Sequence, residues 1–132
     1  MKLGIVVSEF YGEDITGKML AVSLQACQEN NVEAEVIKVP GSFDIPLPVK
    51  KLLKRKDIAG VITLGAIIEG DTDHDGVIAY ALAATLQNLS LEFEKPVVLG
   101  VNGPKMSWKQ AVDRIPRARD VTEACIRMCR LP

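Results

Sequence analysis

Short apolar runs alternate along the chain with longer stretches in which apolar residues recur every three or four positions, the pattern of strands alternating with helices. Residues 3–7 are continuously apolar, as in a strand covered on both faces. The strands are predicted at 3–7, 33–39, 60–68 and 96–101, and the helices at 16–28, 45–55, 77–91, 107–115 and 118–130. This order predicts an α/β fold with a four-stranded parallel sheet in a three-layer α/β/α arrangement, because right-handed crossovers place helices on both faces. No linker interrupts the pattern, so one domain is expected over 1–132.

Prolines and glycines help to define the boundaries of the predicted helices and strands. Pro46 suits the first turn of a helix, whereas Pro48 leaves the start of that helix open. The run 102–104, Asn-Gly-Pro, predicts a turn after the fourth strand. Pro116 separates the last two predicted helices.

Composition and charge narrow the possible partners. With 132 residues and 48% hydrophobic content, the chain can bury a substantial core. Its 16 basic and 17 acidic residues are mixed along the chain, which argues against a nucleic-acid surface. No apolar run approaches the ~20 residues of a membrane span, and the chain starts directly in a predicted strand. We therefore expect a cytoplasmic protein with neither nucleic-acid nor membrane partners.

The three cysteines, Cys27, Cys125 and Cys129, are odd in number, so no disulfide framework follows from them. Cys125 and Cys129 lie four positions apart, on one face of a predicted helix. With one histidine and no Cys-x-x-Cys unit, no metal site is expected, and buried thiols in a reducing compartment fit better.

Polar and aromatic residues follow the first two predicted strands. Phe10 and Tyr11 follow the first, where an aromatic ring either stacks on a planar heterocycle or fills the core. Ser42 and Asp44 follow the second strand, and in isolation helix capping explains them best.

The last two strands lead to candidate anion-binding and proton-transfer groups. Gly70, Thr72 and His74 follow the third strand, where glycine amides can approach an anion and imidazole can move protons near neutral pH; the alternative is a solvated loop. The chain then reaches Gln110 and Arg114 after the fourth strand. Because parallel strands end at one edge of the sheet, these groups together predict a ligand site.

Five segments carry a family resemblance, in matching order and spacing: 9–10, 39–46, 64–74, 95–100 and 110–114. On these motifs the sequence resembles archaeal-type 6,7-dimethyl-8-ribityllumazine synthases over nearly its whole length. The resemblance implies a flavodoxin-like sheet and small-molecule substrates. It also implies condensation of 5-amino-6-ribitylaminouracil with 3,4-dihydroxy-2-butanone 4-phosphate, without a metal or other cofactor.

The resemblance also assigns residues to the first substrate. Phe10 matches the aromatic residue that stacks on the pyrimidine, and the backbone of Ala66, Ile67 and Ile68 matches the groups that hold the ring edge. Ser42, Phe43 and Asp44 match the loop that binds the ribityl chain. Asp44 stands where a glutamate is usual, and its shorter carboxylate must approach more closely or act through water. Leu99 replaces a phenylalanine common at the subunit boundary.

The same resemblance assigns the phosphate site and the proton carrier. Asp71 and Thr72 fall at the phosphate-binding turn, with the Asp71 side chain directed away from the anion. Arg114 matches a phosphate-binding arginine that the neighbouring subunit contributes, and Arg119 is a second candidate, matched across a short deletion. His74 is implied as the main proton-transfer residue. The implied assembly is a homopentamer, or a shell of 60 chains.

Three alternatives remain open. A paralogous archaeal riboflavin synthase would consume the lumazine, although the histidine-bearing turn argues against it. A phosphoacceptor receiver domain needs an acidic pair after the first strand, where only Glu9 is present. A noncatalytic shell protein that binds flavin or lumazine is the third.

Overall fold

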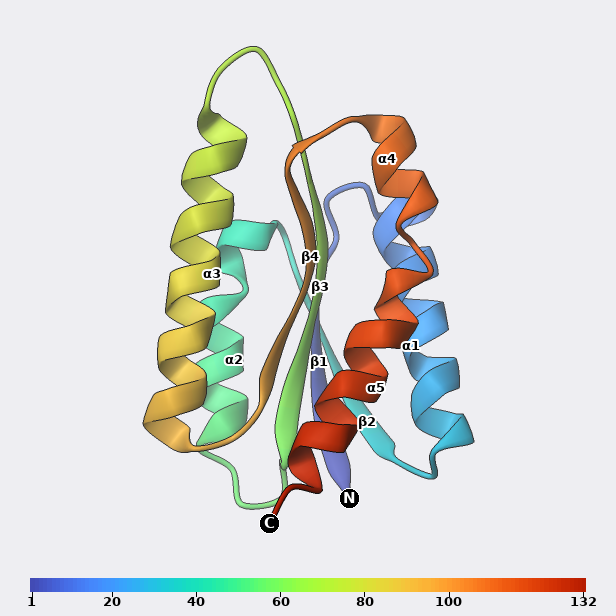
Figure 1. Ribbon diagram of the computed structural model, residues 1–132, viewed down its shortest axis with the longest axis vertical. Helices are drawn as coiled ribbons and strands as arrows, with labels where there is room; N and C mark the ends of the chain where they lie inside the picture. Colours follow the sequence, from blue (N-terminus) through green and yellow to red (C-terminus); the bar gives the residue numbers. More distant parts are fainter.

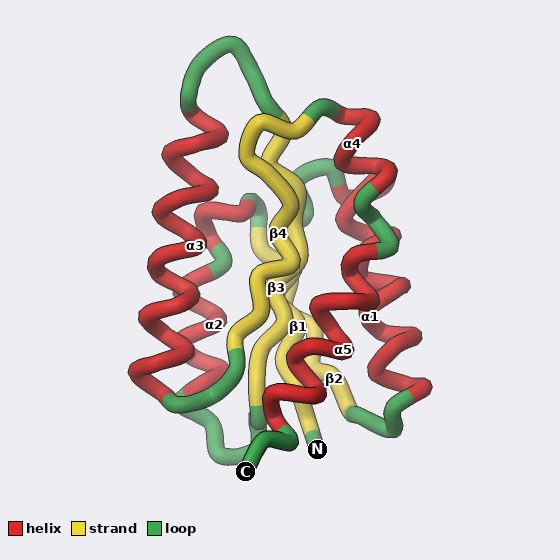
Figure 2. Tube along the Cα trace, in the orientation of Figure 1, coloured by secondary structure: helices red, strands yellow, loops and turns green.

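The computed structural model describes residues 1–132, which form one parallel sheet between two layers of helices (Figures 1 and 2). The strands are β1 (Lys2–Ser8), β2 (Glu33–Val39), β3 (Gly60–Ile68) and β4 (Val97–Met106), in the spatial order β2-β1-β3-β4. The helices are α1 (Gly17–Glu29), α2 (Pro46–Leu53), α3 (His74–Phe93), α4 (Trp108–Asp113) and α5 (Arg117–Cys129). Two short helical turns, η1 (Gly12–Thr16) and η2 (Ser42–Asp44), complete the chain. The predicted α/β class and three-layer arrangement are confirmed.

Each face of the sheet has its own apolar core. Helices α2 and α3 cover one face, and α1, α4 and α5 cover the other (Figure 1). Alternate side chains of β1 belong to the two cores. Ile5 lies in the same core as Met19 of α1, and Val6 lies in the same core as Leu52 of α2. This double coverage explains why the central strands are continuously apolar. None of the helices is both long and apolar enough to span a membrane.

The predicted turn at 102–104 is wrong, because β4 continues through these residues to Met106. The ladder with β3 changes register between Ala66 and Ile68, and Gly103 takes a φ of 120° before a cis bond to Pro104. Since β4 is an edge strand, proline is tolerated there, and the local turn signals produce an irregularity within the strand.

The start of one helix differs from expectation, and the start of another, which Pro48 left open, is now defined. The third helix begins at His74, three residues before the predicted start, so His74 is the first residue of α3. Helix α2 begins at Pro46 and contains Pro48 in its first turn. Backbone N–H groups in a first turn have no partner within the helix, so both prolines fit without loss of a hydrogen bond.

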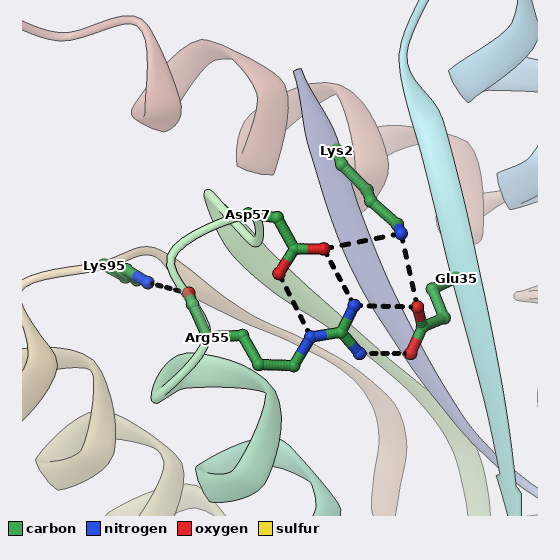
Figure 3. A network of polar contacts seen from close by, with 5 residues as sticks. All are labelled: Lys2, Glu35, Arg55, Asp57 and Lys95. Atoms are coloured by element: carbon green, nitrogen blue, oxygen red, sulfur yellow. Dashed lines mark hydrogen bonds and ion pairs between the residues drawn. The ribbon is translucent and has the colours of Figure 1, made fainter.

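A network of charged residues lies at the amino end of the sheet (Figure 3). The Arg55 guanidinium donates to Glu35 of β2 at 2.6 Å and to Asp57 at 2.8 Å. Lys2 of β1 approaches both carboxylates, at 3.4 and 3.5 Å. Lys95 donates to the Arg55 carbonyl at 2.7 Å. The network therefore connects the first two strands to the loop between α2 and β3.

We expect this network to make the fold sensitive to acid. Hydrogen bonds from Arg55 lower the pKa of Asp57 from 3.8 to about 2, and that of Glu35 in the same direction. A carboxyl group with a lowered folded-state pKa stabilises the fold above its ordinary pKa, and this contribution disappears as pH falls through the folded value. The stability difference between wild type and Asp57→Asn should therefore shrink between about pH 4 and pH 2. Urea unfolding at stepped pH measures it, and a constant difference would contradict the prediction.

Candidate active site

A cavity of about 320 Å³ opens at the carboxyl ends of β1 and β3, near the arch between β3 and α3 at the top of Figure 1. Three segments that are distant in sequence line it: the loop after β1, the loop after β2, and the continuous stretch from the end of β3 to the start of α3. The lining residues are Phe10, Tyr11, Gly41, Ser42, Phe43, Ala66, Ile67, Ile68, Gly70, Thr72, His74, Asp75 and Ile78. The volume and the mixture of apolar walls with a few polar groups are typical of a small-molecule site.

The loop after β1 presents an aromatic wall. The Phe10 side chain is 59% exposed, so it does not fill the core, and its backbone N–H donates to Ser8 Oγ at 3.2 Å. The Tyr11 ring meets the Phe10 ring edge-on at 4.6 Å, and Trp108 of α4 meets Tyr11 at 5.5 Å. Tyr11 has a φ of 65°, which turns the chain sharply after Phe10. The Phe10 ring is thus held from one side and available to a planar ligand.

The loop after β2 rests directly on β3. Ser42 is buried, and its Oγ would lie 2.8 Å from a Cβ at position 65, so the loop can settle there only because that residue is Gly65. Asp44 Oδ2 accepts the Gly41 N–H at 3.0 Å, which confirms a capping role for this carboxylate. Asp44 lines an adjoining groove between α2 and α3. Ser42 lines the cavity, and Phe43 lines both the cavity and the groove.

The start of α3 supplies the polar side of the cavity. His74 is exposed there, and its backbone N–H lies 3.4 Å from Thr72 Oγ1. Asp75, which sequence reasoning did not select, is buried and accepts the Lys105 N–H at 2.9 Å. This bond connects the start of α3 to the end of β4. Because Asp75 precedes the predicted helix at 77–91, no sequence signal pointed to this hydrogen bond.

Comparison with known proteins decides the family. The family model for 6,7-dimethyl-8-ribityllumazine synthase matches residues 1–132. The chain belongs to this family. It is 48% identical over 132 residues to the lumazine synthase of Metallosphaera sedula, covering 98% of this chain and 87% of that protein. It is 44% identical to the lumazine synthase of Picrophilus torridus, covering 99% of this chain and 96% of the relative. A third relative with the same name, from Methanopyrus kandleri, is 44% identical over 98% of this chain and 92% of its own.

Most positions assigned by the lumazine synthase resemblance lie together in this cavity. They are Phe10, Ser42, Phe43, Ala66, Ile67, Ile68, Thr72 and His74. Asp71 is exposed next to the cavity without lining it. Leu99 is 48% exposed on β4 and lines a different hollow, shared with Tyr80 of α3.

The two arginines assigned to phosphate in lumazine synthases have different surroundings. Arg114 follows α4, is half-buried and forms no salt bridge, but it does not line this cavity. Arg119 on α5 pairs with Glu29 of α1, and its Nε lies 2.9 Å from Glu123. Both contacts raise the pKa of Arg119, with the Glu29 hydrogen bond as the largest cause. Within one chain, Arg119 therefore joins two helices.

Proposed function

We propose that this chain condenses 5-amino-6-ribitylaminouracil with 3,4-dihydroxy-2-butanone 4-phosphate to give 6,7-dimethyl-8-ribityllumazine, with release of phosphate. This is the penultimate step of riboflavin biosynthesis. The observation that carries the proposal is the meeting of Phe10, Ser42 and His74 in one cavity of a full-length family member.

The cavity walls suggest how the pyrimidine substrate binds. The exposed Phe10 ring stacks on the heterocycle, and the backbone at Ala66, Ile67 and Ile68 holds the ring edge. Ser42 and Phe43 contact the ribityl chain. Asp44 uses Oδ2 to cap its own turn, which leaves Oδ1 to accept from a ribityl hydroxyl, directly or through water.

The reaction requires several proton transfers. The amine of the pyrimidine attacks the ketone to form an imine, phosphate leaves, and the resulting enol tautomerises before the second ring closes. His74 lines the cavity and carries the protons, because imidazole gains and loses them near neutral pH. Thr72 and the adjoining backbone bind the phosphate, with the Asp71 carboxylate directed away. Arg114, supplied by a neighbouring chain, completes this site.

We propose a homopentamer as the active unit, either alone or as the building block of a shell of 60 chains. Leu99 and Arg114 lie outside this chain's own cavity, as expected of residues that serve a neighbour. Val77 and Tyr80 are 61% and 65% exposed and lie three positions apart on α3, and Tyr80 lines the same hollow as the exposed Leu99. Burial of these exposed apolar side chains against a second copy of the chain would favour self-association. The three free cysteines suit a cytoplasmic location.

Leu99→Asp is expected to break this assembly and abolish most activity, because a charge at an apolar contact must be desolvated without a partner. Light scattering with an activity assay measures both effects. Leu24→Asp, on α1 at the opposite face, introduces the same charge and should leave mass and activity unchanged. A fully active wild-type monomer would contradict the pentamer proposal.

The proposed reaction has a direct test. The purified chain is incubated with both substrates while lumazine absorbance is followed, and formation of the product supports the proposal. Supplying lumazine alone tests the riboflavin synthase alternative, which predicts riboflavin. Tight binding of lumazine without turnover in either assay would favour the noncatalytic shell protein.

A further inference from the structure

Two thiols meet at the amino end of β3, at the opposite end of the sheet from the candidate active site. Cys125 and Cys129 lie one turn apart on α5, and both side chains point at Gly60, the first residue of β3. A Cβ at position 60 would lie 3.2 Å from Cys125 Sγ and 2.9 Å from Cys129 Sγ. The glycine therefore leaves the space in which the two sulfur atoms gather.

The two thiols have unequal surroundings. Cys125 is fully buried, with Sγ 3.9 Å from the Val61 carbonyl, a weak contact. Cys129 is half-buried, and its Sγ lies 3.5 Å from the Ala59 carbonyl oxygen. A hydrogen bond from Cys125, with help from the positive charge of Arg130, lowers the pKa of Cys129. The same contact and burial raise the pKa of Cys125. Cys129 is thus the more readily ionised of the two thiols, and it is also the more exposed one.

Cys27 provides a comparison within the same chain. It is buried on α1, and burial alone raises its pKa. Burial and the raised pKa both disfavour reaction of Cys27 with a peroxide, because the reactive nucleophile is an exposed thiolate.

We propose that Cys129 and Cys125 are a reversible redox pair, which a peroxide oxidises to a disulfide within α5. The Cys129 thiolate attacks one peroxide oxygen, so that an S–O bond forms, the O–O bond breaks and hydroxide leaves. Cys125 then attacks the sulfenic sulfur and gives up its proton, so that an S–S bond forms and the S–O bond breaks. The two thiols lose two electrons and two protons, and hydrogen peroxide becomes two molecules of water.

The helix explains why this modification is reversible. Residues four apart on a helix have Cβ atoms about 5–6 Å apart, whereas a disulfide needs about 3.5–4.5 Å. Closing the bond must unwind or tighten the last turn of α5, and Cys129 is the final residue of that helix, where turns fray. A disulfide closed against this resistance is readily reduced.

Tryptic mapping of the full wild-type chain tests the proposal. After brief treatment with hydrogen peroxide, free thiols are alkylated in denaturant and the chain is cleaved with trypsin. Cleavage after Arg127 separates the two cysteines, so a disulfide would join peptides 120–127 and 128–130. We expect this linked pair, two hydrogens lighter than its separate parts and released by a thiol reductant. Cys27 should remain alkylated.

Alkylation rates and variants provide independent measurements. In the untreated protein, Cys129 should react with iodoacetamide about tenfold faster than Cys27, because it is the more ionised and exposed thiol. In Cys125→Ser, the linked pair should be lost while dimedone traps a sulfenic acid at Cys129. The proposal is overturned if peroxide leaves all three thiols free, if the disulfide includes Cys27, or if Cys129 alkylates no faster than Cys27.

Discussion

Arg114→Ala is expected to raise the KM for the phosphorylated ketone by about 10- to 100-fold, because a charged hydrogen bond contributing about 1.5–3 kcal/mol is lost. The KM for the pyrimidine should hardly change, because only one of the two substrates carries phosphate. Arg114→Lys should restore part of the affinity, since an ammonium retains the charge but lacks the bidentate geometry. Steady-state kinetics with each substrate varied in turn separates the two constants.

Arg119→Ala tests the second arginine that the family resemblance assigns to phosphate. The Arg119 guanidinium is already paired with Glu29 and Glu123, so its loss should lower stability slightly and leave both KM values unchanged. If Arg114→Ala changes neither substrate dependence, or if Arg119→Ala produces the effect expected at Arg114, the phosphate assignment is wrong.

His74→Ala is expected to reduce turnover by about 10- to 100-fold, at or below the usual contribution of one proton-transfer group. We expect a limited reduction because the substrate phosphate can also move protons. Much of the acceleration comes from holding two substrates together, which this substitution leaves in place. Substrate affinity should change less than turnover, and the fold should persist because the side chain is exposed.

Single-turnover rates for His74→Ala and wild type, measured over about pH 6 to 8, test this role. Asp73→Asn provides a neighbouring control, because Asp73 is exposed at the start of α3 and does not line the cavity. Its rate should equal that of wild type. Equal rates for His74→Ala and wild type across this pH range would remove His74 from the mechanism, even with the overall reaction intact.

Hydrophobic periodicity was sufficient to predict the sheet and the five helices, because burial on one or both faces leaves a regular signal. It failed at 102–104, where local turn signals stand within an edge strand that tolerates proline. It also placed the start of α3 too late. The apolar repeat begins at Val77, whereas the helix begins with the polar residues His74 and Asp75.

The candidate site was predictable where one loop places a side chain beside its own strand end, as for Phe10 and Ser42. Contacts between distant segments were not predictable. Asp75 meets the Lys105 amide 30 residues later, and Arg119 meets Glu29 across 90 residues. Sequence position also does not specify side-chain direction. The placement of Asp44 in a neighbouring groove could therefore not be predicted.

The contact between Ser42 and Gly65 links the position of one cavity wall to the size of the residue at position 65. A methyl group at position 65 would push the Ser42 loop away from β3 and move one wall of the cavity with it. We therefore expect the sizes of these two side chains to vary inversely among relatives. A protein that acquires alanine at position 65 should tolerate it only together with glycine at position 42, and the pair would then evolve as one steric unit.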